Sequence, residues 1–315
     1  MTFIISKDQA GKTVLSFLRS KLKISSSALS ALKRDPIGIC ANGAHVTVRY
    51  ILREGDLLSV NEIDLPEESN EAILPVNIPL NVIFENDDIM LIDKPPHMPT
   101  HPSHGHVDDT LANAVSYIYK ERGVPFVFRP IGRLDRNTSG ISLIAKHSLS
   151  ASFMYYARQK SLINKKYLAI LCGRVEGDGA FHTIETHMKR QEESIIVRCV
   201  SDSDEEGSFI SITKWRLLYA NDSISIVEAI PITGRTHQLR VHFAHIGHPI
   251  LGDDVYGEPL ELINRHALHA ALLSLPIPYD DEAHDFVSPP PRDMVEAARH
   301  FGCDLEEVFK NSFNK

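Results

Sequence analysis

The segment Pro130-Ile-Gly-Arg-Leu-Asp-Arg-Asn-Thr-Ser-Gly140 is the densest polar stretch in the middle of the 315-residue sequence. Glycines enclose it and β-favouring residues 141–146 follow it directly, which predicts a loop held against the start of a strand. Asp135 lies between Arg133 and Arg136, and cations within about 4 to 6 Å keep a carboxylate ionised even where water is excluded. An ionised, partly desolvated carboxylate can act as a nucleophile or a base. A surface loop of Arg–Asp ion pairs is the alternative that these letters alone leave open.

Hydrophobic patterns on both sides of this loop alternate between strands and helices. Residues 81–85 and 89–93 predict strands, and Asp109 can begin a helix that continues to residue 119. Further along the chain, residues 149–157 show a helical pattern. Strand-like patterns follow at residues 165–171, 209–218 and 223–230. We therefore expect an α+β fold in which helices flank a mixed, largely antiparallel β-sheet.

Two later segments place polar side chains on or next to predicted strands. Tyr167, in Lys165-Lys-Tyr-Leu-Ala169, points to one face of its strand. Arg235 follows a strand that ends near residue 230, and a helix is predicted directly after it, over residues 236–246. An arginine at this place can form a bidentate pair with a carboxylate or bind a phosphate only. The sequence pattern leaves both interpretations open.

Together these segments resemble the motifs of the RluA-type RNA pseudouridine synthases, and they occur in the family's order. The resemblance covers about residues 80–275 and rests on the catalytic loop, the K-x-Y-x-A strand, the third motif, the GDxxYG motif and an LHA segment, at Arg133–Gly140, Lys165–Ala169, Pro231–Gly247, Gly252–Gly257 and Leu268–Ala270. The family usually has His where this chain has Gly132. The resemblance implies the pseudouridine synthase fold.

The resemblance also implies that the protein isomerises specific uridines in structured ribosomal or transfer RNA to pseudouridine. It makes Asp135 the essential carboxylate, which attacks the base, attacks the sugar carbon or removes a sugar proton. It implies that Tyr167 stacks on the target base and assists a late proton transfer, and that Arg235 pairs with Asp135. Arg133 and Arg136 can contact RNA or fill the space that the flipped base leaves. The isomerisation consumes no redox equivalent and no group donor, so we expect no cofactor.

The first 64 residues carry a charge of +3, whereas the remainder carries −11. Helical spacing predicts two short helices, over residues 14–22 and 25–32, and Asn42-Gly43 predicts a hairpin between strands at 37–41 and 44–48. With a last strand at 57–60, this order resembles the S4 RNA-binding domain. The candidates for phosphate contacts in this unit, which otherwise form a solvated basic face, are Arg19, Lys33 and Arg34.

The chain is divided by a stretch rich in proline and glutamate, residues 65–79, which predicts a linker. We therefore expect an S4-like RNA-binding domain at residues 1–64 and a pseudouridine synthase catalytic domain at residues 80–290. Residues 291–315 are predicted to form a C-terminal tail with one short helix.

Composition limits the other classes of function. The net charge of −8 argues against a protein that simply coats nucleic acid. The apolar runs are far shorter than the roughly 20 residues that cross a bilayer, so we expect a cytoplasmic protein. The 16 histidines include clusters at 97–106 and 237–248, but neither has the HExxH spacing, and we expect no metal.

RNA is the partner that these observations predict, for a monomer without an obligatory protein partner. A non-catalytic RNA-binding or assembly protein with the same fold is the alternative function, although Asp135, Tyr167 and Arg235 together argue against it. A hydrolase that uses the histidines is a more distant alternative. The residues do not indicate which RNA or which uridine is modified.

Overall fold

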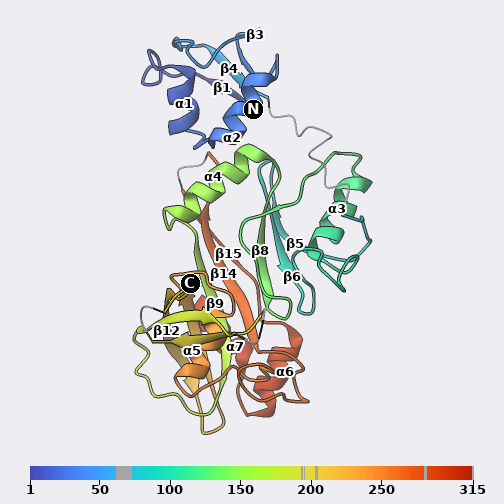
Figure 1. Cartoon of the computed structure of the whole chain (residues 1–315), viewed down its shortest axis with the longest axis vertical. Helices are drawn as coiled ribbons and strands as arrows, with labels where there is room; N and C mark the ends of the chain where they lie inside the picture. Colours follow the sequence, from blue (N-terminus) through green and yellow to red (C-terminus); the bar gives the residue numbers. More distant parts are fainter. Residues whose placement is uncertain (62–72, 193, 195, 203–204, 280–281, 314–315) are drawn as a thin grey trace.

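The computed structural model describes residues 1–61, 73–192, 194, 196–202, 205–279 and 282–313. Within these residues the strands form two sheets, one of four strands and one of eleven. The small sheet belongs to the N-terminal unit and the large sheet to the rest of the chain (Figure 1). Of the predicted linker at 65–79, residues 65–72 lie outside the described residues.

The N-terminal unit packs two helices against its small sheet. Thr13 and Ser25 cap the helices, because each side chain accepts a hydrogen bond from a backbone N–H three residues further on. Asn42 and Gly43 form the hairpin with φ of 52° and 81°. The second hairpin strand extends only over two residues, not over the predicted 44–48. The elements are β1 (Thr2–Ile4), α1 (Val14–Ser20), α2 (Ser26–Arg34), β2 (Ile39–Ala41), β3 (Ala44–His45) and β4 (Leu57–Val60), in the sheet order β1-β4-β2-β3.

The large sheet confirms the predicted mixed, largely antiparallel architecture. Its order is β11-β10-β12-β13-β9-β14-β8-β6-β5, with β15 added to β14 and β7 to β8. Among the described strands only β8 and β14 pair in parallel, and His269 there lies opposite Ser139, at the end of the predicted catalytic loop. The strands are β5 (Asn81–Glu85), β6 (Ile89–Lys94), β7 (Arg129–Pro130), β8 (Ser139–Ala145), β9 (Asn164–Cys172), β10 (His182–Arg190), β11 (Arg198–Ser201), β12 (Phe209–Ala220), β13 (Ile224–Pro231), β14 (Leu268–Pro276) and β15 (Ala283–Val287).

Five helices accompany the large sheet in the described part of the chain. Three were predicted, α3 (Leu111–Glu121), α4 (Ser148–Gln159) and α5 (Gln238–His245). The prediction of one short helix after residue 291 was wrong, because two are present, α6 (Arg292–His300) and α7 (Leu305–Phe313). Leu305, Phe309 and Phe313 lie one turn apart on α7 and are buried in the core that also contains β9 and β13. These helices therefore complete the hydrophobic core of the large sheet instead of forming a tail.

Helix α4 lies between the N-terminal unit and the large sheet (Figure 1). The Ser152 hydroxyl donates a hydrogen bond of 3.1 Å to the hydroxyl of Ser25, and the ammonium of Lys23 lies 5.0 Å from the ring centre of Tyr156. Leu149 is fully buried within the hydrophobic cluster of the N-terminal unit. Hydrophobic and polar contacts thus fix the N-terminal unit to the helix that leads from β8 to β9.

Candidate active site

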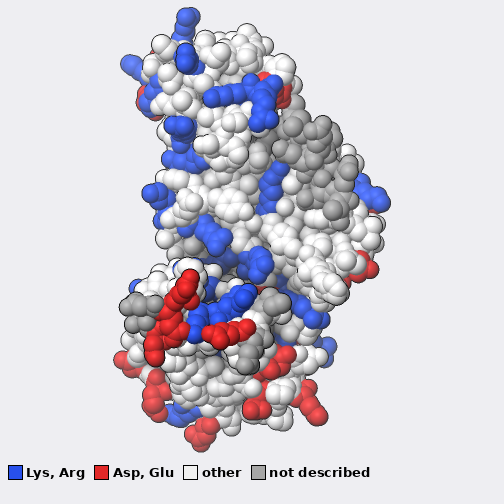
Figure 2. All heavy atoms as spheres, in the orientation of Figure 1, with Lys and Arg blue, Asp and Glu red and all other residues white. Residues whose placement is uncertain are grey.

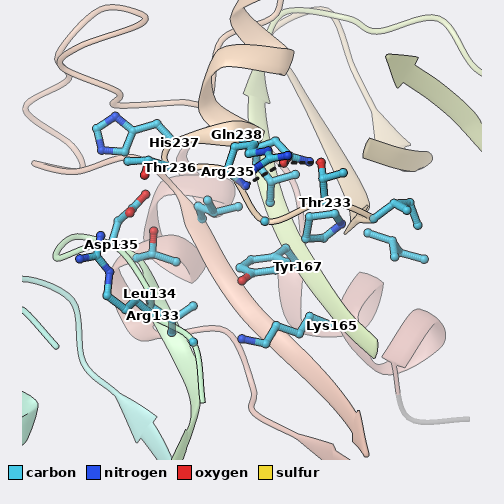
Figure 3. Close-up of a pocket in the computed structure, with 18 of the residues that line it drawn as sticks. Arg133, Leu134, Asp135, Lys165, Tyr167, Thr233, Arg235, Thr236, His237 and Gln238 are labelled. Carbon is cyan, nitrogen blue, oxygen red and sulfur yellow. Dashed lines mark hydrogen bonds between the residues drawn. The ribbon is translucent and has the colours of Figure 1, made fainter. Parts of the chain in front are cut away.

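A pocket of about 430 Å³ lies where the catalytic loop, β9, the last turn of α4 and the segment between β13 and α5 meet. Asp135 and Arg133 line it from the loop, Tyr167 and Lys165 from β9, and Arg235 from the segment before α5 (Figure 3). The structure therefore brings the three predicted catalytic residues to one cavity, although they are far apart in the sequence.

Buried side chains hold the backbone of the catalytic loop by its carbonyl oxygens. The Lys94 ammonium, which is fully buried, donates a hydrogen bond of 3.2 Å to the carbonyl of Arg136. The Arg265 guanidinium, also fully buried, donates one of 3.1 Å to the carbonyl of Asn137. Burial and the nearby Arg265 lower the pKa of the Lys94 ammonium to about 7. Two buried side chains thus fix neighbouring peptide groups immediately after Asp135.

Two further hydrogen bonds and one close backbone contact hold the loop in place. The Thr138 hydroxyl shares a hydrogen bond of 2.8 Å with the imidazole of His266, and the buried Thr100 hydroxyl donates one to the carbonyl of Leu134. Gly140 has φ of +108°, and a Cβ there would lie only 2.3 Å from the carbonyl oxygen of Ala270. Only glycine therefore allows β8 to approach β14 this closely.

The Asp135 side chain is half-buried, and its carboxylate points toward Thr236 and His237 (Figure 3). Within the described residues it forms neither a hydrogen bond nor an ion pair through its carboxylate. An anion that is partly desolvated and not engaged by a partner is free to react with a ligand in the pocket.

Tyr167 lies on β9, and its side chain is 8% exposed. It pairs across the sheet with Ala229 on β13 and Ala270 on β14, whose small side chains leave room beside its ring. Its hydroxyl points into the pocket on the side of the catalytic loop (Figure 3). Burial and the charge of Asp135 raise the pKa of this hydroxyl well above its ordinary value, so it is protonated throughout the physiological range.

The predicted pair between Arg235 and Asp135 is not formed in the structure. The Arg235 guanidinium instead lies 4.9 Å from the ring centre of Phe209, and its Nε donates a hydrogen bond of 3.4 Å to the carbonyl of Ile210. The backbone explains this direction, because the Gln238 side chain accepts a hydrogen bond from the backbone N–H of Arg235 and holds the segment at the start of α5.

The helix itself begins at Gln238, two residues later than predicted, because His237 adopts a left-handed conformation with φ of 57°. His237 consequently turns toward the hydroxyl of Tyr256, with which it shares a hydrogen bond of 2.9 Å. Burial lowers the pKa of the His237 imidazole. No role was predicted for His237, although it lies inside the third motif.

The other predicted RNA-binding residues are exposed but divide into separate groups. Arg133 lines the pocket, whereas the side chain of Arg136 is exposed outside its lining. Figure 2 shows lysine and arginine over the N-terminal unit and around the middle of this face, with most of the acidic side chains below. The exposed basic residues of the N-terminal unit include the three predicted ones, Arg19, Lys33 and Arg34.

Sequence reasoning missed several cations of this pocket. Arg240 also lines it and forms a buried bidentate ion pair with Asp253, at 2.7 and 2.6 Å. Asp253 belongs to the GDxxYG segment, so the adjacent motifs were a signal for this pair. Arg158 and Lys165 line the pocket as well, and burial together with the charge of Arg158 lowers the pKa of the Lys165 ammonium to about 8.

Comparison with known proteins identifies this arrangement. The family model described as RNA pseudouridylate synthase matches residues 88–245, which include the catalytic loop, β9 and all of α5. The chain is 36% identical to the uncharacterized RNA pseudouridine synthase YjbO of Bacillus subtilis, over 87% of this chain and 94% of that protein. The chain belongs to the RNA pseudouridylate synthase family. The predicted family and its isomerase activity are thereby confirmed.

Other members of the RNA pseudouridylate synthase family are similar over most of the chain. The ribosomal large subunit pseudouridine synthase D of Haemophilus ducreyi is 33% identical over 80% of each chain. Among solved structures, human RNA pseudouridylate synthase domain containing 1 is 30% identical, covers 68% of this chain and 84% of its own, and has a TM-score of 0.54. The predicted pseudouridine synthase fold is confirmed by this likeness.

Over the described ranges, no three His, Cys, Asp or Glu side chains come together as a possible metal site. In the same part of the chain, no helix combines the length and the apolar character that a bilayer span requires.

Proposed function

We propose that this protein isomerises specific uridines in structured RNA and that Asp135 is its essential catalytic carboxylate. The observation that carries the proposal is the unengaged Asp135 carboxylate in a pocket that also presents the protonated hydroxyl of Tyr167. The volume of about 430 Å³ falls within the range of sites that enclose small ligands. A single flipped nucleotide is a ligand of that size.

The reaction breaks the glycosidic N–C bond, turns the base, joins C5 to the sugar and removes the C5 proton. We assign Asp135 to the first of these events, as the group that attacks the base or the sugar carbon or removes a sugar proton. Tyr167 stacks on the base and takes part in the last event. Because the Tyr167 hydroxyl is protonated, it can accept the C5 proton only if it passes its own proton to another group. Asp135 is the candidate acceptor, because its negative charge already acts on the Tyr167 hydroxyl.

Arg235 is assigned to holding the Asp135 carboxylate once RNA fills the pocket. Both residues line the same cavity. The contact of Arg235 with Phe209 is of a kind that contributes only about 0.5 to 1 kcal/mol at an exposed site, and its one hydrogen bond is long. RNA binding can therefore exchange these interactions for a bidentate pair with the carboxylate.

RNA binding is assigned to two regions. Arg133 and Arg136 contact RNA at the pocket and offset the cost of removing the target base from its stack, which is a few kcal/mol. The predicted S4-like domain at residues 1–64 binds RNA through Arg19, Lys33 and Arg34. Large-subunit ribosomal RNA is the favoured substrate, because several relatives are named for it. We expect a cytoplasmic monomer.

The experiment that tests this function is a map of pseudouridine in total RNA from cells with and without the protein. Positions that lose the modification, and regain it with the wild-type chain but not with Asp135→Asn, are its substrates. A map that does not change would favour the alternative, a non-catalytic RNA-binding or assembly protein.

A further inference from the structure

Arg158, in the last turn of α4, extends from that helix to the pocket and lies between two glycine-containing segments of its wall. The position that a Cβ would take on Gly132 lies 3.8 Å from Nη1 of Arg158, and the corresponding position on Gly234 lies 3.7 Å from Nη2. The two terminal nitrogens of one guanidinium therefore face two glycines, one from the catalytic loop and one from the segment before α5.

Lys165 completes this group from β9. Its ammonium lies 3.5 Å from the same Cβ position on Gly132, so both cations lie within 4 Å of one point. In Figure 3 the Lys165 side chain points into the pocket, on the same side as the Tyr167 hydroxyl. Arg158 is exposed and Lys165 half-buried, so a ligand can reach both.

No carboxylate neutralises this pair within the described residues. Neither side chain forms an ion pair or a hydrogen bond there, and the charge of Arg158 adds to burial in lowering the pKa of Lys165 to about 8. Two cations held side by side repel each other, and a bound anion removes that repulsion. The arrangement is thus suited to an anionic ligand.

Gly132 makes the space for the pair. It has φ of +91°, a conformation that residues with a side chain rarely adopt. An imidazole on residue 132 would begin in contact with both nitrogens and compete for the space around them. The cationic pair is therefore tied to glycine at position 132 in this chain.

We propose that Arg158 and Lys165 bind a phosphate of the RNA backbone next to the uridine that enters the pocket. This inference rests on the proposed function for the identity of the ligand as RNA. A guanidinium presents its N–H groups as a planar fork that matches two phosphate oxygens, and an ammonium adds a compact charge. Because α4 also carries the N-terminal unit through Ser152 and Ser25, one helix joins that unit to the phosphate site.

The first test measures binding of a fluorescent oligouridylate by anisotropy over a salt series, for the wild type, Arg158→Gln and Lys165→Met. Each lost phosphate contact reduces the log–log salt slope by about 0.7 on a single strand. Arg158→Gln should therefore show this shallower slope and bind roughly tenfold or more weakly at low salt. The matched control is Lys160→Gln, which removes one exposed charge from the end of α4, outside the pocket lining, and should leave the slope unchanged.

The second test locates the phosphate on a fragment that contains the mapped uridine. A neutral methylphosphonate is placed at each linkage around that uridine in turn. At one linkage the methylphosphonate should lower the affinity of the wild type. The same substitution should not lower the affinity of Arg158→Gln further, because that variant already lacks the contact with this phosphate. A slope that does not change in Arg158→Gln, an equal change in Lys160→Gln, or additive losses at every linkage would overturn the proposal.

These outcomes separate the inference from the proposed function. A protein whose salt slope depends on Arg158 but which forms no pseudouridine would retain the phosphate site and lose the function. A protein that forms pseudouridine with a slope independent of Arg158 would retain the function and lose the phosphate site.

Discussion

Replacing Gly140 with alanine should destabilise the catalytic unit at the point where its loop joins the sheet. The added methyl group would lie 2.3 Å from the carbonyl oxygen and 2.6 Å from the nitrogen of Ala270, and neither backbone atom can move without disturbing β14. The unfavourable φ of +108° costs about 1 to 3 kcal/mol, and forced backbone shifts cost about as much again. We therefore expect Gly140→Ala to lower the free energy of unfolding by about 2 to 6 kcal/mol.

The assay is urea unfolding followed by the fluorescence of Trp215, which is the single tryptophan and is buried in the core of the catalytic unit. Gly247→Ala is the matched control, because φ there is +84° but no atom lies within 4 Å of the added Cβ. It should cost only the backbone term, about 1 to 2 kcal/mol. If Gly140→Ala costs no more than Gly247→Ala, the close approach of β8 to β14 does not fix the loop.

Three further outcomes are expected. Tyr167→Phe keeps the ring but removes the hydroxyl, so single-turnover kinetics should show intact RNA binding and turnover slower by about 100-fold to 10,000-fold; an unchanged rate would leave Tyr167 a packing residue. Lys165 has a pKa of about 8, because burial and the charge of Arg158 lower it, and it binds phosphate only when protonated. The affinity for oligouridylate should therefore fall as the pH rises through about 8, and this fall should be absent in Lys165→Met. A chain that begins at Asn77 should still isomerise uridine but bind RNA more weakly, with a shallower salt slope, and unchanged titrations would remove the RNA-binding role of the N-terminal unit.

Local patterns were sufficient for most of the individual elements. Thr13 and Ser25 begin helices because a capping oxygen precedes an apolar stripe, and Asn42-Gly43 turns because both residues accept positive φ. The motif around Asp135 was informative because it places charged residues between two glycines directly before a β-favouring segment. Such a pattern indicates a loop that presents charged groups for binding or catalysis.

The hairpin of β10 and β11 was not predicted from the sequence. Ile184 and Met188 face the core from β10, but Thr186 lies between them on the same face and interrupts the apolar alternation. Its hydroxyl shares a hydrogen bond of 3.1 Å with the buried imidazole of His242 on α5. That partner is distant in the sequence, so a local pattern could not reveal why a threonine belongs there.

Contacts between distant segments were the main limit at the site. Arg158 and Lys165 were not predicted as site residues. Their side chains lie close together only because the chain from α4 to β9 brings both of them next to Gly132. The expected pair of Arg235 with Asp135 came from the family resemblance, and the structure instead places the guanidinium over Phe209. The direction of a flexible side chain depends on its neighbours in space, which the linear pattern does not contain.

The most direct test of the central claim is the rate of pseudouridine formation by Asp135→Asn on the mapped RNA, measured by tritium release under single-turnover conditions. Asparagine has nearly the shape of aspartate but lacks its charge, so unfolding followed by Trp215 and RNA affinity should both stay close to the wild type. We expect turnover to fall by at least about 10,000-fold, as when a residue that reacts with substrate is removed. Turnover near the wild-type rate, in a variant that folds and binds RNA normally, would contradict the assignment of Asp135 as the catalytic carboxylate.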